Sequence, residues 1–198
     1  MNFDFVDIGT SDFDTSLNQR DLGQTVLLVE PIFEYLSKLP DGEGIIKAPF
    51  AISSRNSYRP MHYIDPEIIK EYKLPDFIRG CNSLGYQHPT VIRLLKECGL
   101  EDQYHEIVTV KTVRMITFEK LLNLYEIKKI GFLKIDTEGH DHIILKEVLA
   151  RRKEKKVKID KIKFEYNPVF GNTKELDKLI KVSGYKTAEF VGDNVTLS

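Results

Sequence analysis

The chain has 198 residues, of which 41% are apolar and 30% charged, and its formal net charge is -1. Such a length and composition predict one globular domain with its own core, or at most a core plus a small appendage, and the near-neutral charge disfavours nucleic acid as a substrate. No apolar run approaches the roughly 20 residues of a membrane span, and the acidic N-terminus is unlike a secretory signal, so we expect a cytoplasmic protein.

Short apolar strands alternate with helical stretches along the first quarter of the chain. Strands are predicted over residues 3–8 and 25–29, helices over about 15–22 and 32–39, and a third strand lies within 45–53. From about 54 to 88 three prolines and scattered aromatic residues leave no sustained period until a helix begins at 89. A long irregular stretch favours a functional loop, here an acceptor-binding insertion, over a plain surface excursion.

The remainder of the chain keeps the alternation and then departs from it. The predicted helices span 89–98, 117–125, 140–152 and 174–182, and the predicted strands span 106–113, 130–135, 159–166, 185–191 and 194–197. Strands separated by helices pair in parallel, whereas the last two, with only Gly192-Asp193 between them, form an antiparallel hairpin. We therefore expect a Rossmann-like α/β domain over residues 1–198, with a mostly parallel seven-stranded sheet covered by helices on both faces.

Ligands of open parallel sheets bind beyond the carboxyl ends of the strands, so the residues at these ends are candidates for a site. The first strand ends in Asp7 and Gly9, which can accept hydrogen bonds and let the backbone approach a ligand closely. Glu30 ends the second strand roughly 20 residues past the first turn, where an acid suits ribose hydroxyls. No phosphate-binding glycine pattern follows, so Asp7 and Glu30 favour S-adenosylmethionine over a nucleotide. A bare turn and a helix-capping glutamate are the alternatives.

A dense polar cluster follows the strand at 130–135. Asp136 and Glu138 can act as general bases, and the imidazole of His140 suits proton acceptance near neutrality. Capping of the next helix is the alternative, because acids in a first turn also complement the helix dipole. The basic run 151–158 ends that helix, where a solvated helix end explains it.

Two further oxygen-bearing side chains, Glu165 and Asn167, end the next strand and are expected beside Asp136. These three residues form a candidate site for Mg²⁺ or a similar hard cation, which would lower the pKa of a substrate hydroxyl. Hydrogen bonding to loops or substrate, without a metal, is the alternative that we leave open.

The strand-end motifs resemble those of the FkbM family of S-adenosylmethionine-dependent methyltransferases, whose class I fold has the same sheet and hairpin. The resemblance covers essentially the whole chain in the family's order. Its pieces are Phe5-Val6-Asp7-Ile8-Gly9, Val29-Glu30-Pro31, Ala51-Ile52-Ser53, the segment 77–84 and, most specifically, Leu133-Lys134-Ile135-Asp136-Thr137-Glu138-Gly139-His140.

The resemblance implies a site and a reaction, namely methyl transfer to a hydroxyl oxygen. The implied cofactor-binding residues are Asp7, Gly9, Ser11, Glu30, Phe50, Ala51, Ser53, Asn82, Ser83 and Asp136. The residues implied for proton removal and alignment are Asp136, Glu138, His140 and Glu165, in no fixed order.

Many members of the family methylate sugars, so a sugar hydroxyl of a glycan, such as rhamnose, is the expected acceptor. Arg59, His62, Tyr63 and Arg79 would form a polar acceptor wall in the irregular stretch. A small-molecule or lipid hydroxyl is the alternative, and a non-catalytic scaffold for glycosyltransferases is the alternative from another class. The chain is also similar to methyltransferase parts of multidomain viral proteins, which implies fusion to glycosyltransferase domains in a longer protein.

Overall fold

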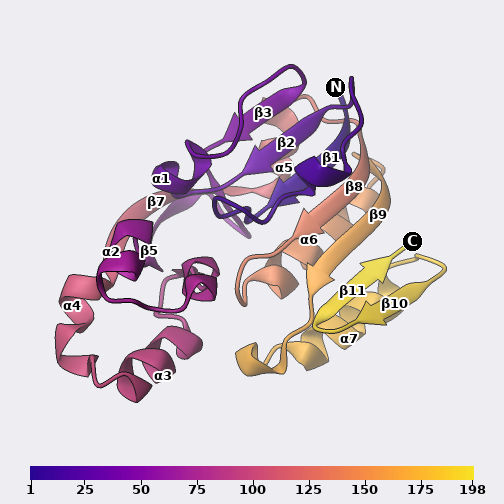
Figure 1. Cartoon of the computed structure of the whole chain (residues 1–198). Coiled ribbons are helices and arrows are strands. Elements are labelled where there is room, and N and C mark those ends of the chain that lie inside the picture. Colours follow the sequence, from indigo (N-terminus) through magenta and orange to yellow (C-terminus); the bar gives the residue numbers. More distant parts are fainter. The chain divides into compact units, whose positions relative to one another are not determined.

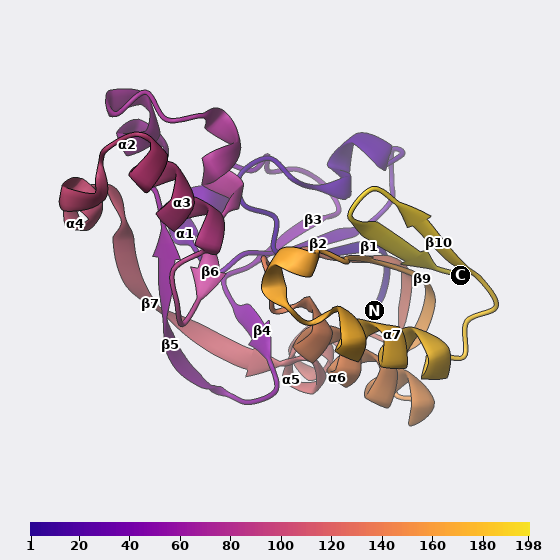
Figure 2. The same cartoon turned by 90° about the horizontal axis from the view of Figure 1, so that it is seen from below.

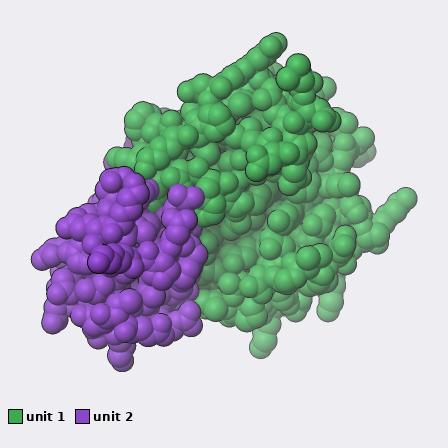
Figure 3. All heavy atoms as spheres, in the orientation of Figure 1, with its two compact units in different colours: residues 1–57, 114–198 green, residues 58–113 purple.

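The computed structural model describes residues 1–198 as two compact units, which Figure 3 shows in two colours. Unit 1 combines Met1–Ser57 with Arg114–Ser198, and unit 2 is the continuous segment Tyr58–Val113. The strands and helices that surround the expected site belong to unit 1, so that unit positions the candidate residues.

Unit 1 is built on a seven-stranded sheet with the order β10-β11-β9-β8-β1-β2-β3 (Figure 1). Its strands are β1 (Asn2–Ile8), β2 (Val26–Val29), β3 (Ile45–Ala48), β8 (Lys129–Ile135), β9 (Lys158–Glu165), β10 (Ala188–Val191) and β11 (Asn194–Leu197). The first five pair in parallel, and β11 pairs antiparallel with both β9 and β10. The predicted mostly parallel sheet with a closing hairpin is confirmed.

Helices cover both faces of this sheet, as expected. One face carries α5 (Phe118–Leu124), α6 (Asp141–Lys153) and α7 (Thr173–Val182), which lie together on one side of the strands in Figure 2. Leu27 and Val29 belong to this core, whereas Val26 and Leu28 point to the other face and pack with Leu36. That alternation is the period of two that a strand covered on both sides requires.

The other face is covered by short helices, η1 (Ser16–Gln19) and α1 (Phe33–Leu36). Both were predicted as longer helices, over 15–22 and 32–39, and both predictions are too long. Leu22 is fully exposed, so the first helix has no apolar stripe beyond Leu17 that could extend it.

A second sheet has the strand order β4-β7-β5-β6. Its strands are β4 (Ala51–Ser53), β5 (Ser57–Tyr63), β6 (Ser83–Leu84) and β7 (Thr109–Thr117). The other elements of unit 2 are α2 (Pro66–Glu71), η2 (Asp76–Gly80), α3 (Pro89–Glu97), η3 (Glu101–Gln103) and α4 (Tyr104–Ile107). Unit 2 has its own apolar cluster, which includes Ile64, Ile78 and Leu95.

The prediction of an irregular stretch between 54 and 88 is therefore wrong in its secondary structure. The prolines that interrupt the period start elements instead of preventing them: Pro66 opens α2, where the Asp65 carboxylate accepts from Glu67 N at 2.9 Å. The strand predicted at 106–113 also shifts, because residues 104–107 form a helical turn and β7 continues to Thr117. The role of this region in acceptor binding stays a prediction.

The longest helix, α6, has 13 residues, and none of the helices combines the length and the apolar character needed to cross a bilayer.

Candidate functional site

The carboxyl ends of β1, β2 and β8 meet at one edge of the large sheet. Ile8 is in register with Val29 on one side and with Ile135 on the other. Beyond the strands, Gly9 N donates to Val29 O at 2.9 Å and Asp136 N donates to Ile8 O at 2.9 Å. Asp7, Glu30 and Asp136, which three separate motifs contribute, are therefore brought to neighbouring positions.

Gly9 is held at this edge by a close backbone approach. Its φ is +81°, and a Cβ built there would lie 1.8 Å from the carbonyl oxygen of Asp136. Only a residue without a side chain allows the loop after β1 to lie against the end of β8 in this way. The glycine of the Asp-Ile-Gly motif thus has a structural reason in this chain.

The carboxylate of Asp7 organises the loop that follows β1. Asp7 is 1% exposed, and its two oxygens accept from Ser16 N at 2.6 Å and from Ser16 Oγ at 2.8 Å. Burial raises the pKa of Asp7 above its usual value, although the Ser16 bonds and the Lys134 ammonium oppose that change. The Asp7 carboxylate therefore holds the loop of residues 9–16 at the end of β1.

Glu30 ties the same loop to the end of β2. Its carboxylate is 3% exposed and accepts from Ser11 N at 2.9 Å through Oε2 and from Ile32 N at 2.9 Å through Oε1. Burial raises the pKa of Glu30 to about 7 against these backbone donors. The bond to Ile32 N lies at the start of α1, so it corresponds to the helix-capping role that was the alternative to ribose binding for Glu30. A hydrogen bond from the backbone of Thr10 adds to these two contacts.

A buried lysine, Lys134, joins the first loop to the end of β8. Its ammonium pairs with the Asp14 carboxylate and lies 3.4 Å from Asp136 Oδ2. Burial raises the pKa of Asp136 well above its usual value. Burial acts in the same direction on Asp14, but the hydrogen bond from Asp136 and the charge of Lys134 lower the pKa of Asp14 overall. The hydrogen bond between Asp136 and Asp14, beside the Lys134 ammonium, makes Asp136 an anchor for the first loop.

Asp141 links the turn after β8 to the end of β9, a role that the sequence patterns missed. Its Oδ2 accepts from Thr137 Oγ1 at 2.9 Å, and its Oδ1 accepts from Glu165 N at 3.4 Å. Burial raises the pKa of Asp141 to about 6. An acid at the first position of a helix is expected from the dipole alone, so only the fold distinguishes this one.

His140 stands at the start of α6 beside β4. Its Nε2 lies 3.0 Å from Ser53 Oγ, and its side chain makes no capping bond to the helix. Burial, followed by the nearby His142, lowers the pKa of His140 to about 4, so the imidazole is neutral at pH 7. A neutral imidazole can accept a proton, which is what the predicted role of His140 requires.

Glu165 ends β9 in a half-buried acidic environment. Burial, and then the neighbouring Glu138, raise the pKa of Glu165 to about 8. Its Oε1 accepts from Asn167 Nδ2 at 3.1 Å, while its buried Oε2 has no hydrogen-bond partner. At pH 7 this carboxyl holds a proton, so it acts as a hydrogen-bond donor and not as a general base.

The expected cation site finds no supporting cluster. Asn167 turns its Oδ1 to Val169 N at 3.0 Å, and its amide nitrogen faces Glu165, so it presents no free oxygen to a metal. The structure contains no group of three or more His, Cys, Asp or Glu side chains that could hold a metal ion. The observed contacts of Asn167 and Glu165 agree with the alternative in which these side chains form hydrogen bonds without a metal.

The remaining expected residues divide between the two units. In unit 1, Ala51 is buried in β4 and Phe50 lies under the guanidinium of Arg114, at 5.4 Å from the ring centroid. In unit 2, Asn82 donates to Arg79 O at 2.9 Å and keeps a buried Oδ1 without a partner, while Ser83 donates to Tyr86 O. Contacts of Asn82 and Ser83 with a cofactor stay a prediction.

An open sheet of this order, closed by an antiparallel hairpin and carrying acids at its strand ends, defines a class I methyltransferase fold. The chain belongs to the FkbM methyltransferase family, because the family model "Methyltransferase FkbM domain" matches residues 6–187.

A solved structure supports the same fold. The crystal structure of methyltransferase FkbM from Methylobacillus flagellatus KT superimposes with a TM-score of 0.54 at 12% sequence identity. The match covers 98% of this chain and 43% of that chain, so this chain spans less than half of the solved protein. A comparison with curated proteins finds no match.

Proposed function

We propose that this chain is an S-adenosylmethionine-dependent O-methyltransferase that acts on a sugar hydroxyl of a glycan. The observation that carries the proposal is the joining of three strand ends by buried carboxylates around Gly9. Membership of the FkbM family supports methyl transfer, and the chemistry of the strand ends supports the cofactor.

The acceptors at this edge match the donors of S-adenosylmethionine. Ribose hydroxyls and an ammonium group donate hydrogen bonds, whereas Glu30 and Asp7 are carboxylates that accept them. Glu30 would hold the ribose, and Asp7, Gly9 and Ser11 would line the methionine part. When bound, S-adenosylmethionine supplies a methyl group activated by a sulfonium centre.

The chain's own contribution to the reaction is to orient an acceptor hydroxyl and to take its proton. His140 is neutral because burial lowers its pKa to about 4, and Ser53 Oγ, 3.0 Å from its Nε2, can relay a hydroxyl proton to it. A weak base suffices, since the hydroxyl becomes more acidic as its oxygen gains positive charge. Glu165, with its pKa near 8, can donate a hydrogen bond to a neighbouring sugar oxygen.

Titration calorimetry with S-adenosylmethionine tests the cofactor. Binding should weaken about 10- to 100-fold in Glu30→Gln, which removes the charge behind its hydrogen bonds. Glu189→Gln, at an exposed position on β10, is the matched control and should bind like the parent chain. Absence of binding by the folded parent chain would contradict the proposal and favour the scaffold alternative.

The acceptor is tested in the same preparation by transfer of labelled methyl groups to rhamnose-bearing oligosaccharides, with and without a chelator. Transfer of the methyl group to the sugar supports the proposal. Loss of that transfer in the presence of the chelator would show that the reaction requires a metal ion. Transfer only to phenolic or lipid hydroxyls would contradict the glycan acceptor while leaving O-methyl transfer intact.

A further inference from the structure

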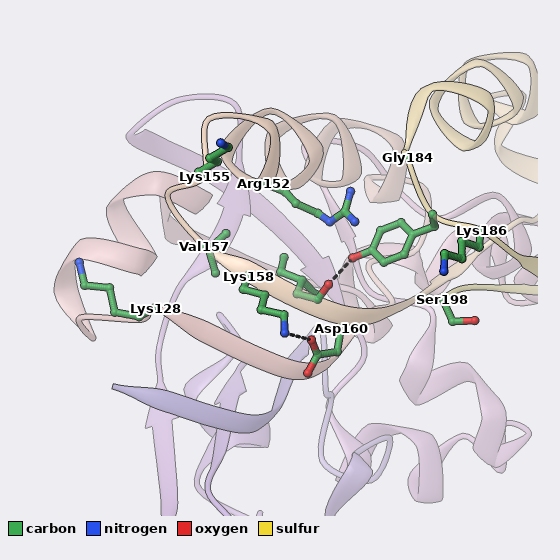
Figure 4. A pocket seen from close by; sticks show the side chains of 11 residues that line it. Lys128, Arg152, Lys155, Val157, Lys158, Asp160, Gly184, Lys186 and Ser198 are labelled. Carbon is green, nitrogen blue, oxygen red and sulfur yellow. Dashed lines mark hydrogen bonds and ion pairs between the residues drawn. The ribbon is translucent and has the colours of Figure 1, made fainter.

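A second cavity lies in unit 1 at the edge of the sheet opposite the strand ends described above. It has a volume of about 820 Å³ and is formed by the start of β9, the end of α6 and residues 184–186 (Figure 4). β9 has 8 residues, so this edge is about 25 Å from the carboxyl end of the strand. The cavity is therefore separate from the proposed methyl-transfer site.

The side chains that line this cavity, the basic pocket, carry a strong excess of positive charge. One of them is a carboxylate, Asp160, and five are cations, namely Lys128, Arg152, Lys155, Lys158 and Lys186. The whole chain has a net charge of -1, so the excess is local and does not reflect a generally basic protein.

Ion pairs within and beside the pocket leave three of the lysines without a partner. Asp160 is already shared between Lys129 at 3.0 Å and Lys158 at 3.4 Å. No carboxylate pairs with Lys128, Lys155 or Lys186, all of which are exposed. The pocket is thus lined by three lysines that form no ion pair, beside the Asp160 carboxylate that Lys129 and Lys158 share.

The basic run that ends α6 is divided by the fold into two groups. Arg151 lies 3.0 Å from both Glu119 and Glu154, and Lys156 also pairs with Glu119, so these charges are compensated away from the pocket. Arg152 and Lys155 instead turn into the pocket. A solvated helix end accounts for the first group, but it does not explain why the second converges with Lys128 and Lys186 from other segments.

Arg152 is held in a fixed orientation. Its guanidinium carbon lies 4.0 Å from the centroid of the Tyr185 ring, and its Nη1 donates to Ser183 O at 2.8 Å. The Tyr185 hydroxyl is itself fixed by donating to Ile159 O at 2.8 Å. A guanidinium that is oriented in advance, with N–H groups to spare, loses little entropy on binding an oxyanion.

We propose that the basic pocket binds a compact polyanion with adjacent phosphate groups, such as the diphosphate of a nucleotide. A planar guanidinium matches phosphate oxygens, and the surrounding lysines supply point charges for a second phosphate. The volume suits a small ligand. This site goes beyond the proposed methyl transfer and does not depend on it.

Calorimetry of the whole chain with inorganic pyrophosphate, with sulfate as a reference at equal ionic strength, tests the pocket. Pyrophosphate should bind more tightly than sulfate. Lys128→Ala, Lys155→Ala and Lys186→Ala should each weaken pyrophosphate binding about threefold to tenfold, and the triple variant should abolish it. Lys153→Ala is the matched control, because Lys153 is exposed in the same helix end but lies outside the pocket.

Three results would overturn the proposal. One is unchanged pyrophosphate binding in the triple variant, and another is an equal loss of binding in Lys153→Ala. The third is tighter binding of a single-stranded oligonucleotide than of pyrophosphate at equal phosphate concentration. Since all the substituted lysines are exposed, the variants should keep the thermal unfolding midpoint of the parent chain, which makes their binding directly comparable.

Discussion

At the scale of single residues, Gly9 decides how closely the first loop lies against β8. A methyl group at this position would collide with the Asp136 carbonyl, which is backbone and cannot move aside as a flexible side chain can. Gly23 has a similar φ of +89° but has nothing within 4 Å of its would-be Cβ. Substitutions at the two glycines therefore distinguish two energetic costs. Backbone strain is common to both positions, whereas a steric collision occurs only at Gly9.

Gly9→Ala should therefore lower the free energy of unfolding by about 3 kcal/mol or more, combining left-handed strain with overpacking. Gly23→Ala should lower it by only about 1 kcal/mol, because it carries the strain alone. Urea denaturation of both variants measures the difference. Equal losses of stability would mean that β1 and β8 can separate at this edge at little cost.

At the scale of elements, the end of β2, the start of α6 and the end of β9 carry carboxyl groups whose pKa values are raised by burial. The pKa is raised to about 7 for Glu30, to about 6 for Asp141 and to about 8 for Glu165. A group whose pKa is higher in the folded than in the unfolded state adds stability that is fully present below the unfolded pKa. That stability is lost as pH rises through the folded value.

For Glu165 the window runs from about pH 4.5 to about pH 8, and over it the free energy of unfolding should fall as pH rises. Glu165→Gln keeps an uncharged side chain at every pH, so its thermal midpoint should fall less steeply between pH 5 and 9. Glu189→Gln controls for the loss of a carboxylate at the surface. A Glu165→Gln curve parallel to that of the parent chain would refute the assignment.

At the scale of the whole molecule, the large sheet and most candidate residues are drawn entirely from unit 1. Residues 51–53 pair with 115–117, so the two segments of unit 1 are joined by strand pairing next to the points where unit 2 leaves and returns. Unit 2 has its own apolar cluster around Leu95 and Ile107. The two units therefore have separate sources of stability.

Replacing residues 58–113 by a Gly/Ser linker of about twelve residues should accordingly leave unit 1 folded, because a linker of that length can return from the end of β4 to the start of what remains of its parallel neighbour β7. We expect S-adenosylmethionine to bind within about tenfold of the parent affinity, and glycan methylation to disappear. Calorimetry and circular dichroism test both points. A folded unit 1 that no longer binds the cofactor would show that Asn82 or Ser83 is essential to the site.

Much of the fold could be predicted from the sequence, because its central strands are continuous apolar runs that only a sheet covered on both faces accommodates. The runs at β1, β2, β8 and β9 lie within one or two residues of their expected bounds. In unit 2 the helix predicted at 89–98 corresponds to α3, but β5, α2, η2 and β6 were missed, since their residues show no sustained period.

The positions of the candidate residues could be predicted from strand ends, but their partners could not. Asp7 bonds Ser16, and Asp141 bonds the backbone of Glu165, through contacts that exist only once the loops have folded. The spacing of these residues carries no signal for such bonds. For the same reason the raised pKa values of Asp136 and Glu165 follow from burial and not from their place in a motif.

The position of β1 in the sheet has a consequence for how the chain acquires its structure during synthesis. β1 leaves the ribosome before the other strands of this sheet, yet one of its two neighbours, β8, begins only at Lys129. Until then β1 has β2 alone beside it, and the apolar side of both strands lacks α6, which begins only at Asp141. The continuous segment of unit 2 can form its local contacts during that interval, so the early strands depend longest on protection from aggregation.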